Sequence, residues 1–511
     1  MILSQIIFNV TLFLMGFVVL TICFKEMETT LRYLLSFFAG MGLWSVVSTL
    51  LIILSIKFCI LSVMLGYFVV VTLIVSIRKK CSLSNSISFE TGSFLKFMVL
   101  FVLANILIYH LFRITNLTPD SVRYLGIGQN IADSGFYAAK ELCFSDYDVA
   151  FYAIARMSFL PSLLAGSYLF GVDFYNTLYP LASLLFLLLI SLIIDDHTEK
   201  FNIGGYKQKL VSLSLPIMLM SVPIYRYHSM YVNQNLFACF YYSLCVLFIL
   251  SFEKSGKLYW LQLGGFCLGL TTLIRSEISI FCLIPTALLL STKLLKCREY
   301  VTFTACFLAI LVPWQIFKTM LAIKANAGFN PESHNNLISL IIQWMSFSLM
   351  FFAVICFYVP LLRKMLLHAP AIFMTVMLAV LVIFLFIKSP DTIKSLSGLG
   401  KVLFFKKFQY MHWGGFWYAL VVILILTTRF LRFKCIASLF YSIISYVLIR
   451  IIIYSLATEA MPSSSGSRIL LHVLPVCCYF MILVVLHFIY LPGRSNIFEP
   501  SSNPFEEEAT L

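Results

Sequence analysis

The chain has 511 residues, of which 61% are apolar and only 11% are charged. This composition excludes a water-soluble globular domain, in which about 45–50% of residues are apolar, and predicts an all-α polytopic membrane protein. The formal net charge of +14 would suggest nucleic acid as a partner of a soluble protein. In a membrane protein, however, Lys and Arg first mark the cytoplasmic loops, so we expect no nucleic-acid partner.

Segments long enough to cross a bilayer, which takes about 20 apolar residues, number about fifteen. The first is followed directly by Lys25 and Glu26 without a small-residue cleavage site, so we interpret it as a retained helix rather than a signal peptide. The candidate spans are 6–24, 32–54, 57–77, 95–112, 174–194, 209–225, 232–252, 258–274, 276–292, 301–321, 337–360, 369–388, 415–429, 435–455 and 469–491. The spans within 1–80 carry no evident polar site, and we interpret them as an accessory bundle that precedes a core of residues 81–491.

Clusters of Lys and Arg orient these spans. They are Arg78-Lys79-Lys80, Lys254 with Lys257, Lys293 with Lys296 and Arg298, Arg363-Lys364, and Arg429 with Arg432 and Lys434. All fall on one face if the helices alternate, and that face is cytoplasmic by the positive-inside rule. Residues 113–173 then form one long external loop, provided that 149–170 lies against the outer leaflet instead of crossing it.

Two further segments stand out by composition. The stretch 388–415 carries several lysines on the predicted external side, which indicates either a misplaced helix or a surface for anionic lipid head groups. The polar, acidic tail 492–511 is predicted to be disordered and cytoplasmic.

The external loop begins with the polar stretch TPDSVRYLGIGQNIADSGFY at 118–137. Pro119 suits the first helical position, and Asp120 follows in the first turn, where the helix dipole favours negative charge. Arg123 and Tyr124 share the helix face of Asp120. The carboxylate is therefore a candidate proton acceptor for a hydroxyl, and the guanidinium a candidate phosphate ligand. Alternatively, Asp120 only caps the helix and pairs with Arg123.

The pattern Pro-Asp-x-x-Arg-Tyr-x-x-Ile-x-x-x-Ile-x-x-Ser-Gly is present as Pro119, Asp120, Arg123, Tyr124, Ile127, Ile131, Ser134 and Gly135. It resembles the first external loop of GT-C membrane glycosyltransferases, in the branch of the aminoarabinose lipid A transferases and the protein O-mannosyltransferases. Three later stretches fit in the same order: SFLPSLLAGSYLFGVDFYNTLYPLAS, GGFCLGLTTLIRSEISIFCLIP and SRILLHVLP. In them Arg275 stands where Lys is usual, and Ile469 takes a Tyr position after Arg468. The resemblance covers roughly residues 95–490.

The resemblance implies a GT-C type bundle of about 13–15 spans that moves a sugar from a polyprenyl-phosphate donor to an extracytoplasmic acceptor, usually with inversion. It implies Asp120 as the general base. It further implies that Arg123, Arg275 and Arg468 hold the donor phosphate, with Tyr124 orienting it. The family setting also indicates a bacterial inner membrane, with the active site on the periplasmic face.

The chain departs from the family pattern at several positions. Ser121 follows Asp120 where many relatives carry Glu, so a divalent metal cofactor stays open. The usual Lys-Pro-Pro-Leu segment is missing, and CFSDYDVAFY with Lys140 before it takes its place. An Asn can bond to a sugar but cannot act as a base, so Asn233 and Asn235 differ in kind from the Asp that relatives carry there. Candidate acceptor or sugar contacts are Lys140, Asp146, Asp148, His228, Asn233, Asn235, Glu277 and His412.

Other interpretations of these residues remain open. In the simplest alternative, Arg275 and Glu277 form an ion pair with each other at the membrane–water interface. Arg468 then only anchors the end of its helix at that interface. The first rival function is an O-antigen-type polysaccharide polymerase or ligase, which would centre on later loops. The second is a non-enzymatic transporter or flippase of lipid-linked glycans, with charges near the bilayer midplane on broken helices. The partners expected in the main interpretation are the lipid-linked donor, a lipid, glycan or protein acceptor, and membrane lipids.

Overall fold

The computed structural model describes residues 2–80, 91–111, 119–135, 158–172, 175–201, 203–326, 332–405, 412–456 and 465–490. For some of these it describes the backbone alone: 77–80, 119–120, 123, 200, 276–278, 321–326, 332–339, 342, 454, 456 and 465–467. All regular elements in the described ranges are helices. The prediction of an all-α polytopic membrane protein is confirmed at this level.

The first half of the chain forms α1 (Ile2–Cys23), α2 (Thr29–Ile53), α3 (Ile60–Lys80), α4 (Thr91–Leu111), α5 (Pro119–Ser134), α8 (Phe159–Leu169), α9 (Leu178–Thr198), η1 (Glu199–Phe201), α10 (Gly205–Ser221), α11 (Pro223–His228) and α12 (Asn235–Ser255). The second half forms α13 (Leu258–Ile274), η2 (Ser276–Cys282), α14 (Leu283–Leu290), α15 (Cys297–Asn326), α16 (Glu332–Cys356), α17 (Pro360–Leu366), α18 (Ala369–Ile387), α19 (Ser389–Gly400), η3 (Lys401–Phe405), α20 (Phe416–Thr427), η4 (Thr428–Phe430), α21 (Lys434–Leu456), α22 (Ser465–Leu470), η5 (Leu471–Val473) and α23 (Leu474–Tyr490).

Nine helical segments in the described part of the chain are long and apolar enough to cross a membrane. They are Ile2–Cys23, Thr29–Ile53, Thr91–Leu111, Leu178–Thr198, Asn235–Ser255, Cys297–Met320, Ala369–Ile387, Lys434–Ile453 and Arg468–Tyr490. Several other predicted spans form shorter apolar helices, among them α13, α14 and α20. The sequence-based count of about fifteen therefore exceeds the nine segments of the described residues that meet the length of a bilayer.

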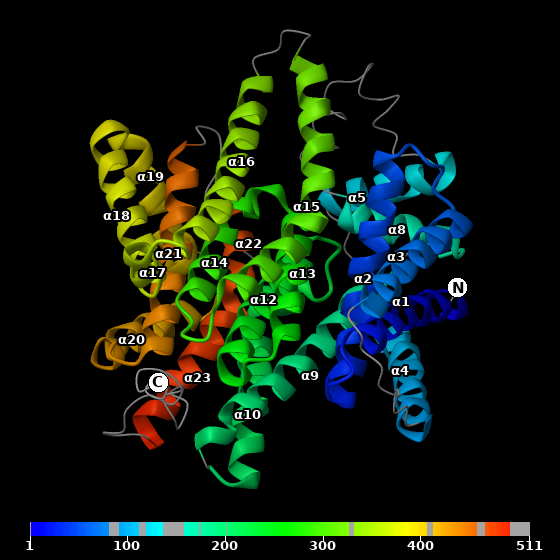
Figure 1. The fold of residues 1–511 in the computed structure, drawn as a ribbon, viewed down its shortest axis with the longest axis horizontal. Helices are drawn as coiled ribbons and strands as arrows, with labels where there is room; N and C mark the ends of the chain where they lie inside the picture. Colours follow the sequence, from blue (N-terminus) through cyan, green and yellow to red (C-terminus); the bar gives the residue numbers. More distant parts are fainter. Residues whose placement is uncertain are drawn as a thin grey trace.

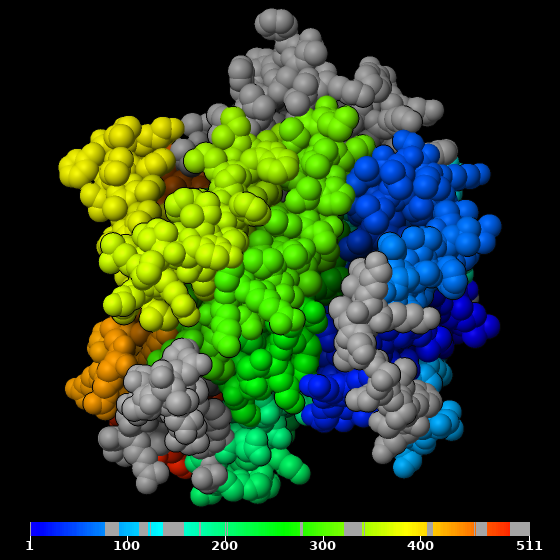
Figure 2. Space-filling model, in the orientation of Figure 1, coloured from blue at the N-terminus to red at the C-terminus, as the bar shows by residue number. Residues whose placement is uncertain are grey.

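The helices are arranged around α12, whose apolar span is buried along its whole length. In Figure 1, α1–α5 and α8 lie on one side of it and α18–α21 on the other, while α15 and α16 rise together beyond the rest. The space-filling view shows the same order, with the middle of the chain between its N-terminal and C-terminal parts (Figure 2).

Glycines allow close contacts between helices, among them the contact of α13 with α15. A Cβ at Gly265 of α13 would meet the backbone carbonyl of Phe303 in α15, and one at Gly269 would lie 3.0 Å from the carbonyl oxygen of Phe307. Small residues four apart let two backbones approach closely in this way, as in membrane helix pairs generally. The stretch GGFCLGL, part of the family resemblance, thus also has a structural role, because its glycines let α13 pack closely against α15.

Helix α8 differs from the expectation for 149–170, of which residues 149–157 lie outside the described part of the chain. Its 11 residues are too short to span a bilayer, which agrees with the sequence interpretation, but Phe159–Ser167 are buried instead of lying on a leaflet. The helix packs between α2 and α5, and Trp44 of α2 donates its indole N–H to the Ser162 carbonyl at 3.0 Å. Protein rather than lipid therefore covers α8.

Candidate functional site

The candidate site lies where α12 begins and α13 ends. Helix α13 stops at Ile274, and Arg275 takes an extended conformation (φ −144°, ψ 119°) before η2 continues the chain. This break frees the Arg275 side chain from the helical face. Its Nη1 donates a hydrogen bond to Oδ1 of Asn235, the first residue of α12.

Two asparagines hold this arginine contact in place. Oδ1 of Asn233 accepts hydrogen bonds from the backbone N–H of Asn235 at 2.9 Å and from the Asn235 side-chain amide. Both asparagines are almost fully buried. Because the Asn235 amide donates to Asn233, its oxygen must face Arg275. The predicted site residues Arg275, Asn233 and Asn235 thus lie together, and their roles toward a substrate stay predictions.

His228 at the end of α11 is the most unusual polar group of this region. Its side chain is fully buried, and neither ring nitrogen has a hydrogen-bond partner among the residues that the structure describes. The rings of Tyr227 and Tyr231 lie 5.5 and 5.6 Å from it. Burial, followed by the positive charges of Arg468 and Arg275, lowers the pKa of His228 to about 3. The imidazole is therefore neutral at physiological pH and offers one donor and one acceptor.

Arg468 lies in α22 and brings the C-terminal part of the chain to the site. Burial and the neighbouring Tyr231 raise the pKa of Tyr227, and the positive charge of Arg468 opposes this shift only in part. Helix α22 is held by Tyr446 of α21, which donates to the Ile469 carbonyl at 3.0 Å. Arg468 and Arg275 thus both influence His228, and their role toward a donor phosphate stays a prediction.

Helix α5 reaches the same region through its first turn. It begins at Pro119, as the sequence predicts, and Oγ of Ser121 donates to the backbone carbonyl of Val232 at 3.1 Å. Val232 directly precedes Asn233, so this bond fixes the turn that carries Asp120 beside the asparagine loop. The sequence resemblance marks Ser121 only as a position that lacks a carboxylate, whereas in the structure its hydroxyl anchors the first turn of α5 to Val232.

Tyr124 is 1% exposed and therefore faces the protein interior. The first-loop helix also buries Ile131, and a Cβ at Gly128 would lie 2.7 Å from Cβ of Leu164 in α8. One side of α5 is thus occupied by α8, and Val122, which is 55% exposed, points away from the protein.

The remaining predicted site residues are placed only in part. His412 is half-buried, and its carbonyl accepts the N–H of Ile224 at 3.2 Å, next to the start of α11. The side chains of Asp120, Arg123 and Glu277, and the whole of Lys140, Asp146 and Asp148, lie outside the described residues. Within the described part, no three His, Cys, Asp or Glu side chains are close enough to share a metal ion.

Arg450 is a buried cation that the sequence interpretation overlooked. It lies in α21 and is 2% exposed, one turn after Tyr446. The signal was available, since an ionisable residue inside an apolar span is a functional hypothesis by default. It was missed because the positive-inside rule directs attention to cations at helix ends.

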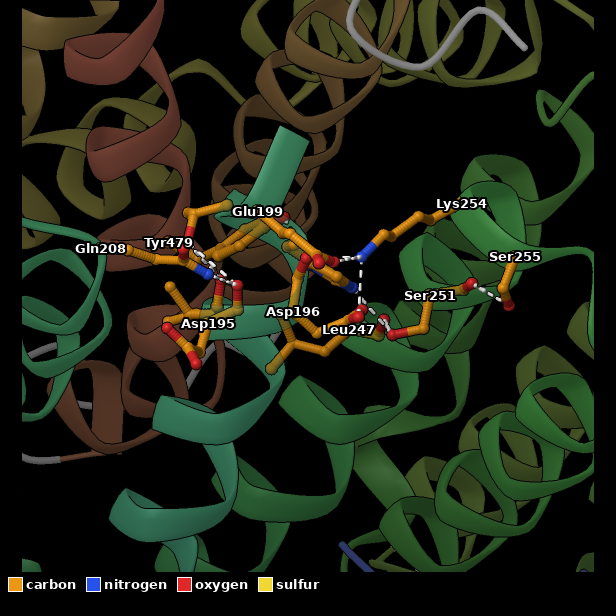
Figure 3. A network of polar contacts seen from close by, with 12 residues as sticks. Asp195, Asp196, Glu199, Gln208, Leu247, Ser251, Lys254, Ser255 and Tyr479 are labelled. Atoms are coloured by element: carbon orange, nitrogen blue, oxygen red, sulfur yellow. Dashed lines mark hydrogen bonds and ion pairs between the residues drawn. The ribbon is translucent and has the colours of Figure 1, made fainter. Parts of the chain in front are cut away.

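A second polar cluster lies at the opposite ends of α9 and α12 (Figure 3). Nζ of Lys254 lies 2.7 Å from Oδ1 of Asp196 and 3.7 Å from Oε2 of Glu199. The neighbouring His197 bridges the hydroxyls of Tyr479 at 2.8 Å and Ser251 at 2.9 Å. These contacts tie α9, α12 and α23 together at the end away from the candidate site.

Comparison with protein-family models, curated proteins and solved structures finds no match to this chain. What the described part of the structure defines is a multi-pass helical membrane protein. In it the half-buried Arg275 and Arg468 influence the buried His228 near the junction of α5, α11, α12, α13 and α22.

Proposed function

We propose that the protein is a glycosyltransferase that moves a sugar from a polyprenyl-phosphate-linked donor to an acceptor hydroxyl at the external face of a bacterial cytoplasmic membrane. One observation carries the proposal: Arg275 and Arg468 converge on the buried, neutral His228 beside the anchored first turn of α5. Guanidinium groups are the preferred partners of phosphate oxygens, and the first turn of α5 carries the carboxylate Asp120.

The chemistry assigns a role to each group. The acceptor oxygen forms a bond to the anomeric carbon while the bond from that carbon to the phosphate oxygen breaks. The hydroxyl proton passes to the carboxylate of Asp120. The lipid phosphate leaves with the bonding electrons, and Arg275 and Arg468 stabilise its charge. General-base catalysis contributes about 10²–10⁴ in rate, and cations at the leaving group act where negative charge develops.

Asn235 supports this assignment because it positions Arg275 without bringing a second charge of its own. A neutral amide orients the guanidinium yet leaves the attraction for an anion in place. The neutral imidazole of His228 adds a donor for a phosphate oxygen. Both groups are buried, and hydrogen bonds to a charged ligand are stronger where water is excluded.

A transporter of lipid-linked glycans is the second candidate, because the break between α13 and η2 places Arg275 between two helical segments, as in transporters with broken helices. The two candidates differ in a reaction that needs no bilayer. A transferase in detergent micelles releases the polyprenyl phosphate from its donor, whereas a transporter releases none.

The decisive experiment replaces Asp120 in a strain that lacks the chromosomal gene. The glycoconjugate lost on deletion identifies the product, and wild-type protein should restore it while Asp120→Asn should not. The matched control is Asp133→Asn, since Asp133 is exposed at the far end of the same helix. Membrane abundance and the gel-filtration profile report folding. An Asp120→Asn protein that restores normal amounts of the product would exclude the base assignment.

A further inference from the structure

An apolar groove lies between α10, α20 and α23, which gather at the lower end of the molecule in Figure 1. Its volume is about 390 Å³, within the range of about 300–1,000 Å³ that is usual for ligand pockets. The lining runs along α10 from Leu210 to Met218 and along α23 from Met481 to Tyr490, and α20 contributes Ile423. The groove is therefore open along the sides of three packed helices, away from the candidate site.

The walls of the groove suit a hydrocarbon chain. Among the described residues that line it, only Ser214 and Tyr490 carry a hydroxyl, and the others are apolar. The Ser214 hydroxyl already donates to the Val211 carbonyl of its own helix at 2.6 Å. At 1.5 Å per residue, the lining of α23 extends over about 14 Å. This length is close to one leaflet of the hydrocarbon core, which is about 30 Å thick in all.

Four cations lie in the segments at one end of the groove, where α10 begins and α23 ends. Lys207 and Lys209 are in the first turns of α10, directly before the lining residues. Arg429 and Arg432 lie between α20 and α21, in and just after η4. All four side chains are exposed, and none has an ion-pair partner among the residues that the structure describes.

Ring contacts place the two arginines beside the end of α23. The Phe430 ring lies 6.3 Å from that of Phe488, and the Phe433 ring lies 5.1 Å from that of His487. The guanidinium carbon of Arg432 is 5.0 Å from the centroid of the Phe433 ring. Since His487 and Phe488 belong to the last turns of α23, which also line the groove, the Arg432 charge lies near the mouth of the groove.

Two carboxylates toward the same end of the molecule are engaged elsewhere. Asp196 and Glu199 pair with Lys254 of α12 (Figure 3). They therefore do not neutralise the cations of α10 and η4. The groove thus combines an apolar channel one leaflet long with uncompensated positive charge at one end, which is the complement of a lipid that carries a negative head group.

We propose that this groove binds one anionic phospholipid, with an acyl chain between α10, α20 and α23 and its phosphate between Lys209 and Arg432. Lys207 and Arg429 add to the positive potential, which acts over about 8–10 Å at physiological salt. The positive-inside rule predicts that this end is cytoplasmic, so the lipid belongs to the inner leaflet. It stabilises the packing of the three helices and takes no part in the proposed transfer reaction.

The test titrates the purified full-length protein in detergent micelles with dioleoyl phosphatidylglycerol and with dioleoyl phosphatidylcholine. The two lipids have the same chains and differ in the net charge of the head group. Native mass spectrometry counts the bound lipids and gives their relative affinities. A Lys or Arg at an anionic lipid surface contributes roughly fivefold in affinity. Wild-type protein should therefore bind one phosphatidylglycerol at least about tenfold more tightly than phosphatidylcholine.

Charge variants test the head-group contacts. Lys209→Gln combined with Arg432→Gln should weaken phosphatidylglycerol binding at least about fivefold and change phosphatidylcholine binding by less than about twofold. The matched control, Arg363→Gln with Lys364→Gln, removes one Arg and one Lys from exposed positions of α17 and should change neither affinity. Lys207→Gln with Arg429→Gln serves as a second pair if the first variant does not fold.

Bulky substitutions test the chain contacts. Val485 lines the groove and is 42% exposed, so Val485→Trp should fill the groove and weaken both lipids at least about fivefold. Val422→Trp is the matched control, because Val422 is 56% exposed on α20 and does not line the groove. Ile489→Trp provides a second obstruction. Excess glycerol phosphate, which has the anionic group without the chains, should not displace the bound lipid.

Several results would overturn the proposal. Equal affinity for the two lipids, or an unchanged preference after Lys209 and Arg432 are replaced, would reduce the groove to a surface for ordinary bilayer lipid. Unchanged binding to the Val485→Trp protein would place the lipid elsewhere, and displacement by glycerol phosphate would mean that the chains are not recognised. A wild-type protein that binds neither lipid would mean that another segment or a second copy of the chain covers the groove. None of these results bears on the role of Asp120.

Discussion

The neutral, buried state of His228 predicts a specific loss of stability in acid. In the folded protein its pKa is lowered to about 3, whereas in the unfolded chain it is about 6.5. Above pH 6.5 the ring is neutral in both states. As the pH falls below 6.5, the unfolded chain takes up a proton that the folded protein does not, so the free energy of unfolding decreases. By linkage, the loss reaches about 2 kcal/mol at pH 5.

The substitution His228→Asn removes this pH-dependent contribution to the free energy of unfolding, because the Asn side chain does not titrate. The unfolding temperature of both proteins in detergent micelles is measured from tryptophan fluorescence between pH 8 and pH 5. At this chain length about 2 kcal/mol corresponds to about 2 °C in the unfolding temperature. The variant should start below wild type, because it loses packing, and the difference should shrink by about that amount toward pH 5.

The matched control is His368→Asn, since His368 is exposed in the short connection before α18. The difference between this variant and wild type should be the same at both ends of the pH range. If the His228→Asn curve runs parallel to the wild-type curve, the ring must be hydrated or already paired with an anion in the folded protein. That result would refute the argument that burial beside Arg275 and Arg468 keeps it neutral.

Two further predictions concern packing. Gly265→Val should destabilise the protein by about 1–3 kcal/mol, because its side chain would meet the Phe303 carbonyl and separate α13 from α15; Gly126→Ala, with no atom within 4 Å of the new Cβ, should cause no loss of unfolding temperature. Lys254→Met should cost only about 0–1 kcal/mol, because Asp196, its partner at 2.7 Å, is 56% exposed. A larger decrease in unfolding temperature would mean that the cluster in Figure 3 holds its helices more strongly than a surface ion pair does.

Local sequence signals predicted several elements correctly. The apolar composition indicated the membrane class, since only helices that satisfy their own backbone hydrogen bonds are stable in lipid. Helix α5 begins at Pro119 as expected, because proline at the first position loses no hydrogen bond. The sequence indicates Arg275 between two short helices and Asn233 and Asn235 in the second external loop. In the structure hydrogen bonds join Asn233 to Asn235 and Asn235 to Arg275.

Other features required the packing of distant segments. The apolar stretch 149–170 has the composition of a span or a surface helix, and only the contacts of α8 (Phe159–Leu169) with α2 and α5 show that protein buries it. In the sequence, Ser121 is only a position at which a carboxylate of the family pattern is missing. In the structure its hydroxyl donates to the carbonyl of Val232, which lies 111 positions away in the sequence. No local pattern predicts such a partner.

The sequence by itself therefore determined that this protein is helical and lies in a membrane, and which kinds of charged residue it carries. Composition and periodicity are properties of neighbouring residues and can be read without the fold. Only the tertiary structure decided which charged side chains lie close to one another. Arg275 follows the end of α13, Arg450 lies in α21 and Arg468 lies in α22, and their charges influence the common neighbours His228 and Tyr446. Electrostatic interaction depends on distance in space and on burial, and neither quantity is set until the helices pack.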